Sequence, residues 1–265
     1  MTLTERSVAG ADRGRDNRGA LDRGLDILEY LSETREASTA MIAQHVRLTR
    51  STAYRLLDRL QQRGFVDQRA PGVWVPGAAA ARLAMAAVQS ADVVQVAPEF
   101  LRMLVQQARE TVGLAVPSGD EMVFVYRERG PHFVSVSSEL GARRPLHCTS
   151  VGKAYLAALP MSERVPLIRR LELTRFTPST ITDRNALELE VHHTRERGWS
   201  EDRGEFNEDS TCCGAAILNH AGHPVAAISA AGPTLRTAPQ LHRLGGLVAS
   251  TADAISRRLG YNNDV

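Results

Sequence analysis

The stretch that decides the fold lies at residues 39–64 and reads TAMIAQHVRLTRSTAYRLLDRLQQRG. It predicts a short helix over 39–45 with Ser38 as its N-cap, then a tight turn over 46–48. Thr49 can cap a second, longer helix that runs to about Arg63 and is followed by Gly64, a residue typical of the position after a helix. Three leucines form the buried side of this second helix: Leu56, Leu57 and Leu60. The order of elements predicts a helix-turn-helix.

The segments on either side complete a small domain. A helix from Ala20 is predicted by leucines that recur at intervals of four, three and three residues: Leu21, Leu25, Leu28 and Leu31. After the second helix, the segments 65–68 and 73–75 flank residues 69–72 with a turn at Pro71 and Gly72, which indicates a β-hairpin. Residues 20–77 are therefore predicted to form a winged helix-turn-helix.

The charge of this domain points to nucleic acid. Residues 37–70 hold six arginines and two acids, a net charge of +4, whereas the whole chain carries only +2. A local basic segment on a nearly neutral chain is typical of a nucleic-acid-binding module. An arginine-rich face that is merely solvated is the alternative. The predicted DNA contacts are Arg47, Arg50, Ser51, Thr52, Tyr54, Arg55, Arg59 and Arg69.

Composition limits the class of protein. The chain has 265 residues, of which 43% are hydrophobic and 23% charged, as expected for a globular protein of one or two domains. No apolar run reaches the roughly 18 residues that a membrane-spanning helix needs, and the first 20 residues do not resemble a secretory signal. The three cysteines, Cys148, Cys212 and Cys213, cannot form a disulfide framework, so we expect a cytoplasmic protein.

The rest of the sequence predicts an N-terminal arm, a helical linker and a second domain. Residues 1–19 are expected to be a disordered arm, 78–92 an alanine-rich helical linker, and 93–265 a second domain. That domain begins with a helix at 94–110. Its other predicted elements are strands at 111–116, 122–127, 133–138, 213–218 and 225–230, and helices at 150–159, 183–197 and 240–259. Thr182 precedes the helix at 183–197. Hairpins alternating with helices indicate an α+β sandwich.

Several motifs, in order, carry a resemblance to a known family. They are ALDRGL (20–25), RSTAYRLL (50–57), RPLHCTSVGKA (144–154), TITD (180–183), GWSEDRGE (198–205), CCGAAI (212–217) and ISAAGP (228–233). Over residues 20–260 the chain resembles the IclR-type transcriptional regulators, the isocitrate lyase regulator family. It departs from the family at 74–77 after the wing, and at Gly204 and Cys213. It also has Arg47 where the family usually has glycine in the turn, so either Arg47 is left-handed with a strain of about 1 kcal/mol or the turn differs from that of the family.

The resemblance implies a function as well as a fold. It implies a winged helix joined to a GAF-like effector domain that binds a small aliphatic or aromatic acid from a catabolic pathway. It further implies homodimers, often paired into tetramers, on palindromic double-stranded operators, with no catalytic activity, cofactor or metal. The effector site would comprise Phe133, Val136, Ser150, Val151, Gly152, Asp202, Cys212, Gly214 and Ser229.

This predicted site can be judged by its chemistry. Residues 150–153 open a helix, where unpaired backbone amides and the helix dipole attract an anion. Arg143 or Arg144 could pair with a carboxylate, although a solvated arginine is the alternative for each. Phe133 and Val136 lie three residues apart, so both reach one pocket only if their strand bends.

Other chemistries remain open. Lys153, the only lysine, could form a Schiff base, or it could lie on the helix surface bonded to a carbonyl or to Asp202. Cys212 could be a nucleophile, which would make the protein an enzyme, although no histidine motif faces it. A disulfide from Cys148 to Cys212 or Cys213 would make a redox sensor. His147 with the cysteines could hold zinc, but their spacing matches no standard zinc motif.

Overall fold

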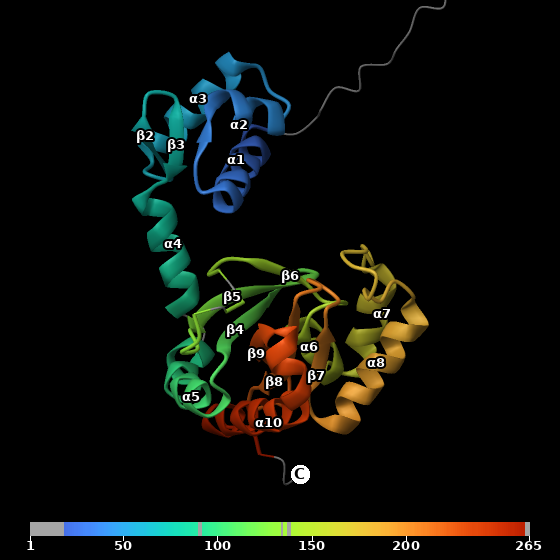
Figure 1. The fold of residues 1–265 in the computed structure, drawn as a ribbon. Coiled ribbons are helices and arrows are strands. Elements are labelled where there is room, and N and C mark those ends of the chain that lie inside the picture. The colour runs from blue at the N-terminus through green and yellow to red at the C-terminus, as the bar shows by residue number, and fades with distance from the viewer. Residues whose placement is uncertain (1–18, 90–91, 134, 137–138, 263–265) are drawn as a thin grey trace, which may run out of the picture. The chain divides into compact units, whose positions relative to one another are not determined.

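A computed structural model describes residues 19–89, 92–133, 135–136 and 139–262 (Figure 1). The predicted arm at 1–19 lies outside the described residues, apart from Gly19, which precedes the first helix. Contacts divide the chain into two compact units, one up to Ala84 and one from Met85, and this division falls inside the linker predicted for 78–92. Among the described helices, none has the length and apolar character required to cross a bilayer.

The first unit is a winged helix-turn-helix, as predicted. Its helices are α1 (Ala20–Thr34), α2 (Thr39–His45) and α3 (Arg50–Gln62), and its strands are β1 (Ala37–Ser38), β2 (Val66–Ala70) and β3 (Val73–Pro76). The strands pair antiparallel in the order β1-β3-β2, and β2 with β3 forms the wing.

The turn between α2 and α3 has the geometry that the sequence predicts. Ser38 accepts a hydrogen bond from the Met41 amide at 3.3 Å, and Thr49 accepts one from the Thr52 amide at 3.3 Å, so both predicted N-caps are confirmed. Arg47 has a φ of 57°, the left-handed conformation expected where the family usually has glycine. Gly64 ends α3 with a φ of 73°.

The core of this unit differs from prediction at the start of α1. Leu21 and Leu25 are 75% and 49% exposed, whereas Ile27 and Leu31 are fully buried. The buried side of α1 is therefore formed by Ile27 and Leu31, which lie four residues apart and so share one face of the helix. Trp74 of β3 packs in the same core, and its indole donates to the Thr39 hydroxyl at 2.9 Å.

The second unit is built on one six-stranded antiparallel sheet in the order β6-β5-β4-β9-β8-β7. The strands are β4 (Thr111–Ser118), β5 (Glu121–Glu128), β6 (Arg143–Pro145), β7 (Ser200–Arg203), β8 (Ser210–Leu218) and β9 (Pro224–Pro233). The two predicted hairpins, β4–β5 and β8–β9, are confirmed, and β4 pairs with β9 at the centre of the sheet.

Helices cover both faces of this sheet (Figure 1). On one face lie α5 (Asp92–Ala108) and α10 (Leu241–Arg258), and on the other lies α6 (Ser150–Ala158). Against α6 packs α8 (Arg184–Arg197), which in turn contacts α7 (Met161–Arg170). Neighbouring strand residues point to opposite faces, so Leu114 packs with α5 and α10 while Ala115 packs with α6.

Several elements depart from prediction. The described residues of the predicted strand at 133–138, Phe133, Ser135 and Val136, are not in a strand. The edge beside β5 is occupied by β6 instead. The helix predicted at 183–197 begins one residue later, because Asp183 caps α8 with a carboxylate that accepts from the Ala186 amide at 2.9 Å. Three elements, β6, β7 and α7, have no clear signal in the sequence, because β6 and β7 are very short and α7 contains Pro166.

The close approach of α6 to β8 generates a prediction. A Cβ on Gly214 would lie 2.8 Å from the carbonyl carbon and oxygen of Ser150. Gly214→Ala should therefore lower the free energy of unfolding by about 1–3 kcal/mol, measured by urea denaturation. Gly246→Ala is the matched control, because Gly246 lies on α10 with no atom within 4 Å of the added Cβ. Gly246→Ala should raise the free energy of unfolding by about 0.5–1 kcal/mol. Equal free energies of unfolding for the two variants would contradict the close packing of Ser150 against Gly214.

Candidate functional site

A cavity of about 130 Å³ opens at the N-terminus of α6. Its wall is drawn from every strand of the sheet apart from β4, together with the start of α6 and the segment after β7. The lining residues are Phe124, Val136, Arg144, Thr149, Ser150, Val151, Asp202, Phe206, Asn207, Ser210, Cys212, Ser229 and Ala231. Six of the predicted effector-site residues meet here: Val136, Ser150, Val151, Asp202, Cys212 and Ser229.

Three predicted residues lie outside this wall, for physical reasons. The side chain of Phe133 is fully exposed to solvent. Gly152 packs its backbone against Leu146, since a Cβ there would lie 2.5 Å from the Leu146 backbone. Gly214 similarly lets Ser150 approach β8. The two glycines therefore shape the cavity by allowing close packing and do not line it.

The start of α6 presents backbone donors to the cavity. The Thr149 hydroxyl caps the helix by accepting from the Gly152 amide at 3.2 Å, and it donates to the Pro145 carbonyl at 2.7 Å. The first helical amides, those of Ser150 and Val151, have no acceptor within the helix. Both residues line the cavity, so these amides and the helix dipole favour a negatively charged group there.

Asp202 places a carboxyl group in the same wall. Its side chain is 3% exposed, and Oδ1 accepts a hydrogen bond from the Glu205 amide at 2.8 Å. Burial raises the pKa of Asp202 to about 7, although that amide bond and the charge of Lys153 act in the opposite direction. Asp202 can therefore either donate or accept a hydrogen bond near neutral pH.

Arg144 is the cavity residue that the sequence left undecided. It lines the wall, while its neighbour Arg143 is exposed and pairs with Glu121 at 3.3 Å. Burial lowers the pKa of the Arg144 guanidinium. Phe124, Phe206, Asn207 and Ser210 were also missed, because only their position in the fold connects them with the predicted residues.

Lys153 differs from the expected surface lysine. It is 1% exposed and forms a buried ion pair with Glu205, with Glu190 at 3.9 Å. Burial raises the pKa of Glu205, and its Oε2 is buried without a hydrogen-bond partner in the described structure. Lys153 does not line the cavity, so its amine is not presented to a ligand as a Schiff base would require.

The cysteines are free thiols: Cys148 and Cys213 are buried, and Cys212 is partly buried in the cavity wall. Burial raises the pKa of Cys148 and of Cys213 to about 12, and it raises the pKa of Cys212 well above its usual value. The reactive form of cysteine is the thiolate, which these environments disfavour at neutral pH. The geometry therefore favours neither a nucleophilic nor a redox role for them.

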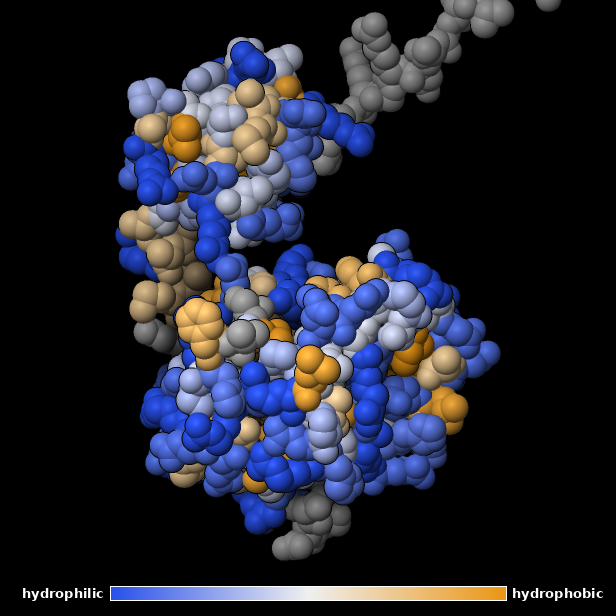
Figure 2. Space-filling model, in the orientation of Figure 1, coloured by the Kyte–Doolittle hydropathy of each residue, from blue (hydrophilic) through white to orange (hydrophobic). Residues whose placement is uncertain are grey.

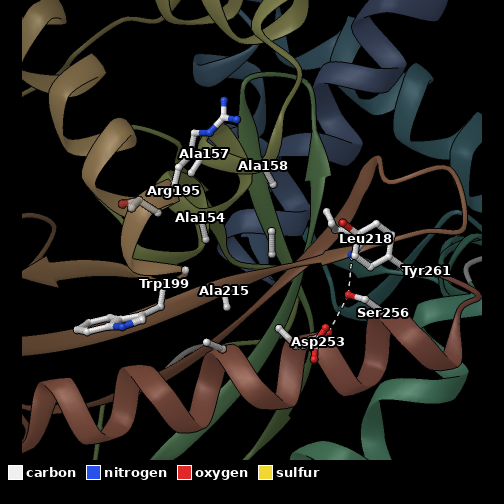
Figure 3. A pocket seen from close by; sticks show the side chains of 15 residues that line it. Ala154, Ala157, Ala158, Arg195, Trp199, Ala215, Leu218, Asp253, Ser256 and Tyr261 are labelled. Atoms are coloured by element: carbon white, nitrogen blue, oxygen red, sulfur yellow. Dashed lines mark hydrogen bonds between the residues drawn. The ribbon is translucent and has the colours of Figure 1, made fainter. Parts of the chain in front are cut away.

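A wider cavity of about 590 Å³ lies between α6, α8, α10 and β8 (Figure 3). Small side chains such as Ala154, Ala157 and Ala215 form much of its wall, and the Leu218 amide donates to the Ser256 hydroxyl at 2.9 Å. None of the predicted effector-site residues lines it. Its wall includes neither the first residues of α6, Ser150 and Val151, nor Asp202, so we assign the candidate effector site to the cavity at the start of α6.

The candidate DNA-contact surface is the outer side of α3. Five predicted contact residues are exposed along this helix: Arg50, Ser51, Tyr54, Arg55 and Arg59. Thr52 is partly buried, and its hydroxyl lies 2.9 Å from that of Thr49, so it is engaged in the helix cap. Arg47 is exposed in the turn, and Arg69 in the wing pairs with Glu36 at 2.9 Å.

A basic helix exposed on a winged helix-turn-helix, together with a domain that encloses a small polar cavity, defines a ligand-responsive DNA-binding transcriptional regulator. Family models agree: residues 20–70 match the IclR helix-turn-helix domain, and residues 85–257 match the bacterial transcriptional regulator IclR C-terminal domain. The chain belongs to the IclR family of transcriptional regulators.

Individual relatives support this assignment. The chain is 36% identical over 244 residues to the HTH-type transcriptional repressor AllR of Klebsiella pneumoniae, covering 91% of this chain and 90% of AllR. AllR of Escherichia coli K12 matches to the same extent. The Thermotoga maritima IclR crystal structure superposes with a TM-score of 0.73 at 28% identity, covering 91% of this chain and 98% of that one. An IclR homologue from Microbacterium hydrocarbonoxydans, crystallised with 4-hydroxybenzoate, has the same fold with a TM-score of 0.77 at 24% identity, covering 91% and 99%.

The raised pKa of Asp202 predicts a pH dependence of stability. Its folded pKa of about 7 exceeds the unfolded value near 3.9, so the folded protein retains a proton that the unfolded chain releases. The proton held by Asp202 therefore makes the folded state most favourable at low pH, and this stabilisation is lost as the pH rises from about 4 to about 7. Urea unfolding across that range should show a smaller loss of stability for Asp202→Asn than for wild type. The exposed Asp209→Asn is the control, and equal slopes for wild type and Asp202→Asn would contradict the prediction.

Proposed function

We propose that the protein is a repressor of a catabolic operon whose small organic acid effector occupies the cavity at the start of α6. The observation that carries the DNA-binding part is the exposed row of arginines on α3. The relatives at 36% identity are named as repressors, which supports repression for this chain. The complex of the Microbacterium homologue with 4-hydroxybenzoate supports a small carboxylic acid as effector. We propose that it acts in the cytoplasm, where its DNA operator would lie.

We assign the reading of the operator to α3. Arg50, Ser51, Tyr54, Arg55 and Arg59 lie along one exposed side, as expected for a helix that enters the major groove. Arginine can donate two hydrogen bonds to guanine O6 and N7, so Arg50 and Arg55 are the proposed base contacts. Arg47 and Arg69 are assigned to phosphates, and Thr52 to holding the start of α3 in place.

The proposed homodimer forms through α4 (Ala78–Gln89). In the described part of this helix, Leu83 is 63% exposed and Met85 is 61% exposed, and Figure 2 colours the surface of α4 as apolar. An apolar helix whose described large side chains are exposed favours association with a second copy. Small alanine side chains allow two such helices to approach closely. Two copies would place their α3 helices in half-sites of a palindrome about 34 Å apart, or a multiple of that.

Effector control then requires a difference in affinity. An acid that binds one arrangement of the paired winged helices more tightly shifts the equilibrium toward it, and a coupling of about 1–3 kcal/mol is sufficient. The helices over residues 78–108 connect the DNA-binding residues with the effector domain along the chain, so we assign the coupling to them.

The experiment that tests the DNA-binding proposal measures operator affinity by fluorescence anisotropy as a function of salt. Arg55→Ala should weaken binding to the specific site by about 1–3 kcal/mol because a base contact is lost. Arg69→Ala should weaken specific and non-specific binding alike and reduce the salt slope by about 1. Arg258→Ala, at the exposed end of α10, is the control. Unchanged operator affinity in an Arg50, Ser51 and Arg55 triple alanine variant would overturn the assignment of α3.

The dimer proposal makes a separate prediction. Leu83→Glu should shift the protein from dimer to monomer in sedimentation velocity, because it places charge in an apolar contact. Leu189→Glu is the matched control, since Leu189 is 56% exposed on α8. A Leu83→Glu variant that sediments as wild type does would show that α4 is not the dimer contact.

A further inference from the structure

Two consecutive arginines on β6 have different surroundings. Successive strand residues point to opposite faces, and Arg143 and Arg144 follow this rule. Arg143 is exposed and pairs with Glu121. The guanidinium carbon of Arg144 lies 4.9 Å from the centre of the Phe206 ring and 5.8 Å from that of Phe124, inside the cavity wall. Two aromatic rings from different segments therefore hold the Arg144 cation in the effector cavity.

Among the described residues, the Arg144 guanidinium forms no direct ion pair, and Glu139 acts on its charge only from a longer distance. The Arg144 Nη1 donates to the carbonyl oxygen of its neighbour Arg143 at 2.8 Å. Within the part of the chain that the structure describes, no carboxylate lies within 4 Å of its guanidinium nitrogens. The buried carboxylate of Glu110, by contrast, receives two hydrogen bonds from Arg236, at 2.6 and 2.7 Å. Charged groups in protein interiors are normally paired, so the position of Arg144 fits an anion supplied from outside the chain.

The shape and charge of the cavity restrict that anion. A guanidinium forks onto a planar carboxylate through two parallel hydrogen bonds, and the amides of Ser150 and Val151 provide further donors in the same wall. Asp202 lines the cavity too, and its carboxyl group disfavours a second negative charge on the ligand. Ser210 and Ser229 provide hydroxyls for a neutral polar group. The combination fits a small monocarboxylic acid with a neutral, hydrogen-bonding remainder.

We propose that Arg144 is the residue that selects effectors by charge, binding the carboxylate of a monocarboxylic acid between Phe124 and Phe206. This inference rests on the proposed function, because it assigns a role within the same effector cavity. Arg144 makes the site discriminate an acid from its neutral amide and a monocarboxylate from a dicarboxylate. Arg143, one residue away, takes no part in binding.

The test uses the full-length protein and matched pairs of probes. Acetate and acetamide, benzoate and benzamide, and 4-hydroxybenzoate and 4-hydroxybenzamide differ mainly in charge, and acetate is small enough for a cavity of about 130 Å³. Malonate tests the exclusion of dicarboxylates. Binding is measured by thermal shift and by calorimetric titration for wild type, Arg144→Gln, Arg144→Lys and the control Arg143→Gln.

The expected result is a loss of affinity confined to acids. Arg144→Gln should bind the best acid at least about tenfold more weakly than wild type, the loss expected for hydrogen bonds to a charged group, while its binding of the matching amide is unchanged. Arg144→Lys should be intermediate because it keeps the charge without the fork. Arg143→Gln should bind acids as wild type does, and malonate should bind wild type more weakly than acetate.

Three results would overturn the proposal. One is equal acid affinity in wild type and Arg144→Gln, and another is an equal loss for acid and amide, which would indicate a packing role. The third is a wild-type protein that no acid in the panel stabilises. These failures are distinct from failure of the proposed function. An acid that releases wild type and Arg144→Gln from the operator at the same concentration would leave the regulator role intact while removing Arg144 from it.

Discussion

The effector cavity depends on how closely the N-terminus of α6 is held against the sheet. Gly214 on β8 leaves room for the backbone of Ser150, and the Ser200 hydroxyl donates to the Ser150 carbonyl at 2.5 Å. On the side of Leu146, Gly152 permits a similarly close contact. These two backbone contacts fix the position of α6, so its first amides face the cavity before any ligand binds. Such pre-organisation reduces the cost of binding a small anion.

Buried charge reinforces this arrangement. Lys153, on the first turns of α6, is paired with Glu205, which follows the strand that carries Asp202. The ion pair therefore ties α6 to the segment that forms the far side of the cavity. Removing one partner of a buried pair leaves an uncompensated charge and is strongly destabilising, so the only lysine of the chain has a structural role. The hydroxyls of Thr177 and Thr180 donate to backbone carbonyls at 204–205 and hold that segment from outside.

The sequence predicted elements whose signals are local, and it failed where a contact is made by distant segments. The N-caps at Ser38 and Thr49 depend on hydrogen bonds within one turn, so their residue types were sufficient to predict them. Lys153 was expected at the surface, because a sequence does not show that Glu205, 52 residues away, supplies its counter-charge. Arg144 remained undecided for the same reason: its surroundings are set by the pairing of β6 with β5 and by Phe206. The family resemblance located six residues of the cavity, yet it did not separate those that line it from the glycines that shape it.

The central claim is that an acid in the α6 cavity and an operator on α3 influence each other through one protein. The most direct measurement is the operator affinity of the full-length protein with and without the acid that stabilises it most, together with the acid affinity with and without operator. Binding equilibria are reciprocal, so the account predicts that both affinities change by the same factor, about 5–150-fold. Operator and acid affinities that are each unaffected by the other ligand would contradict it.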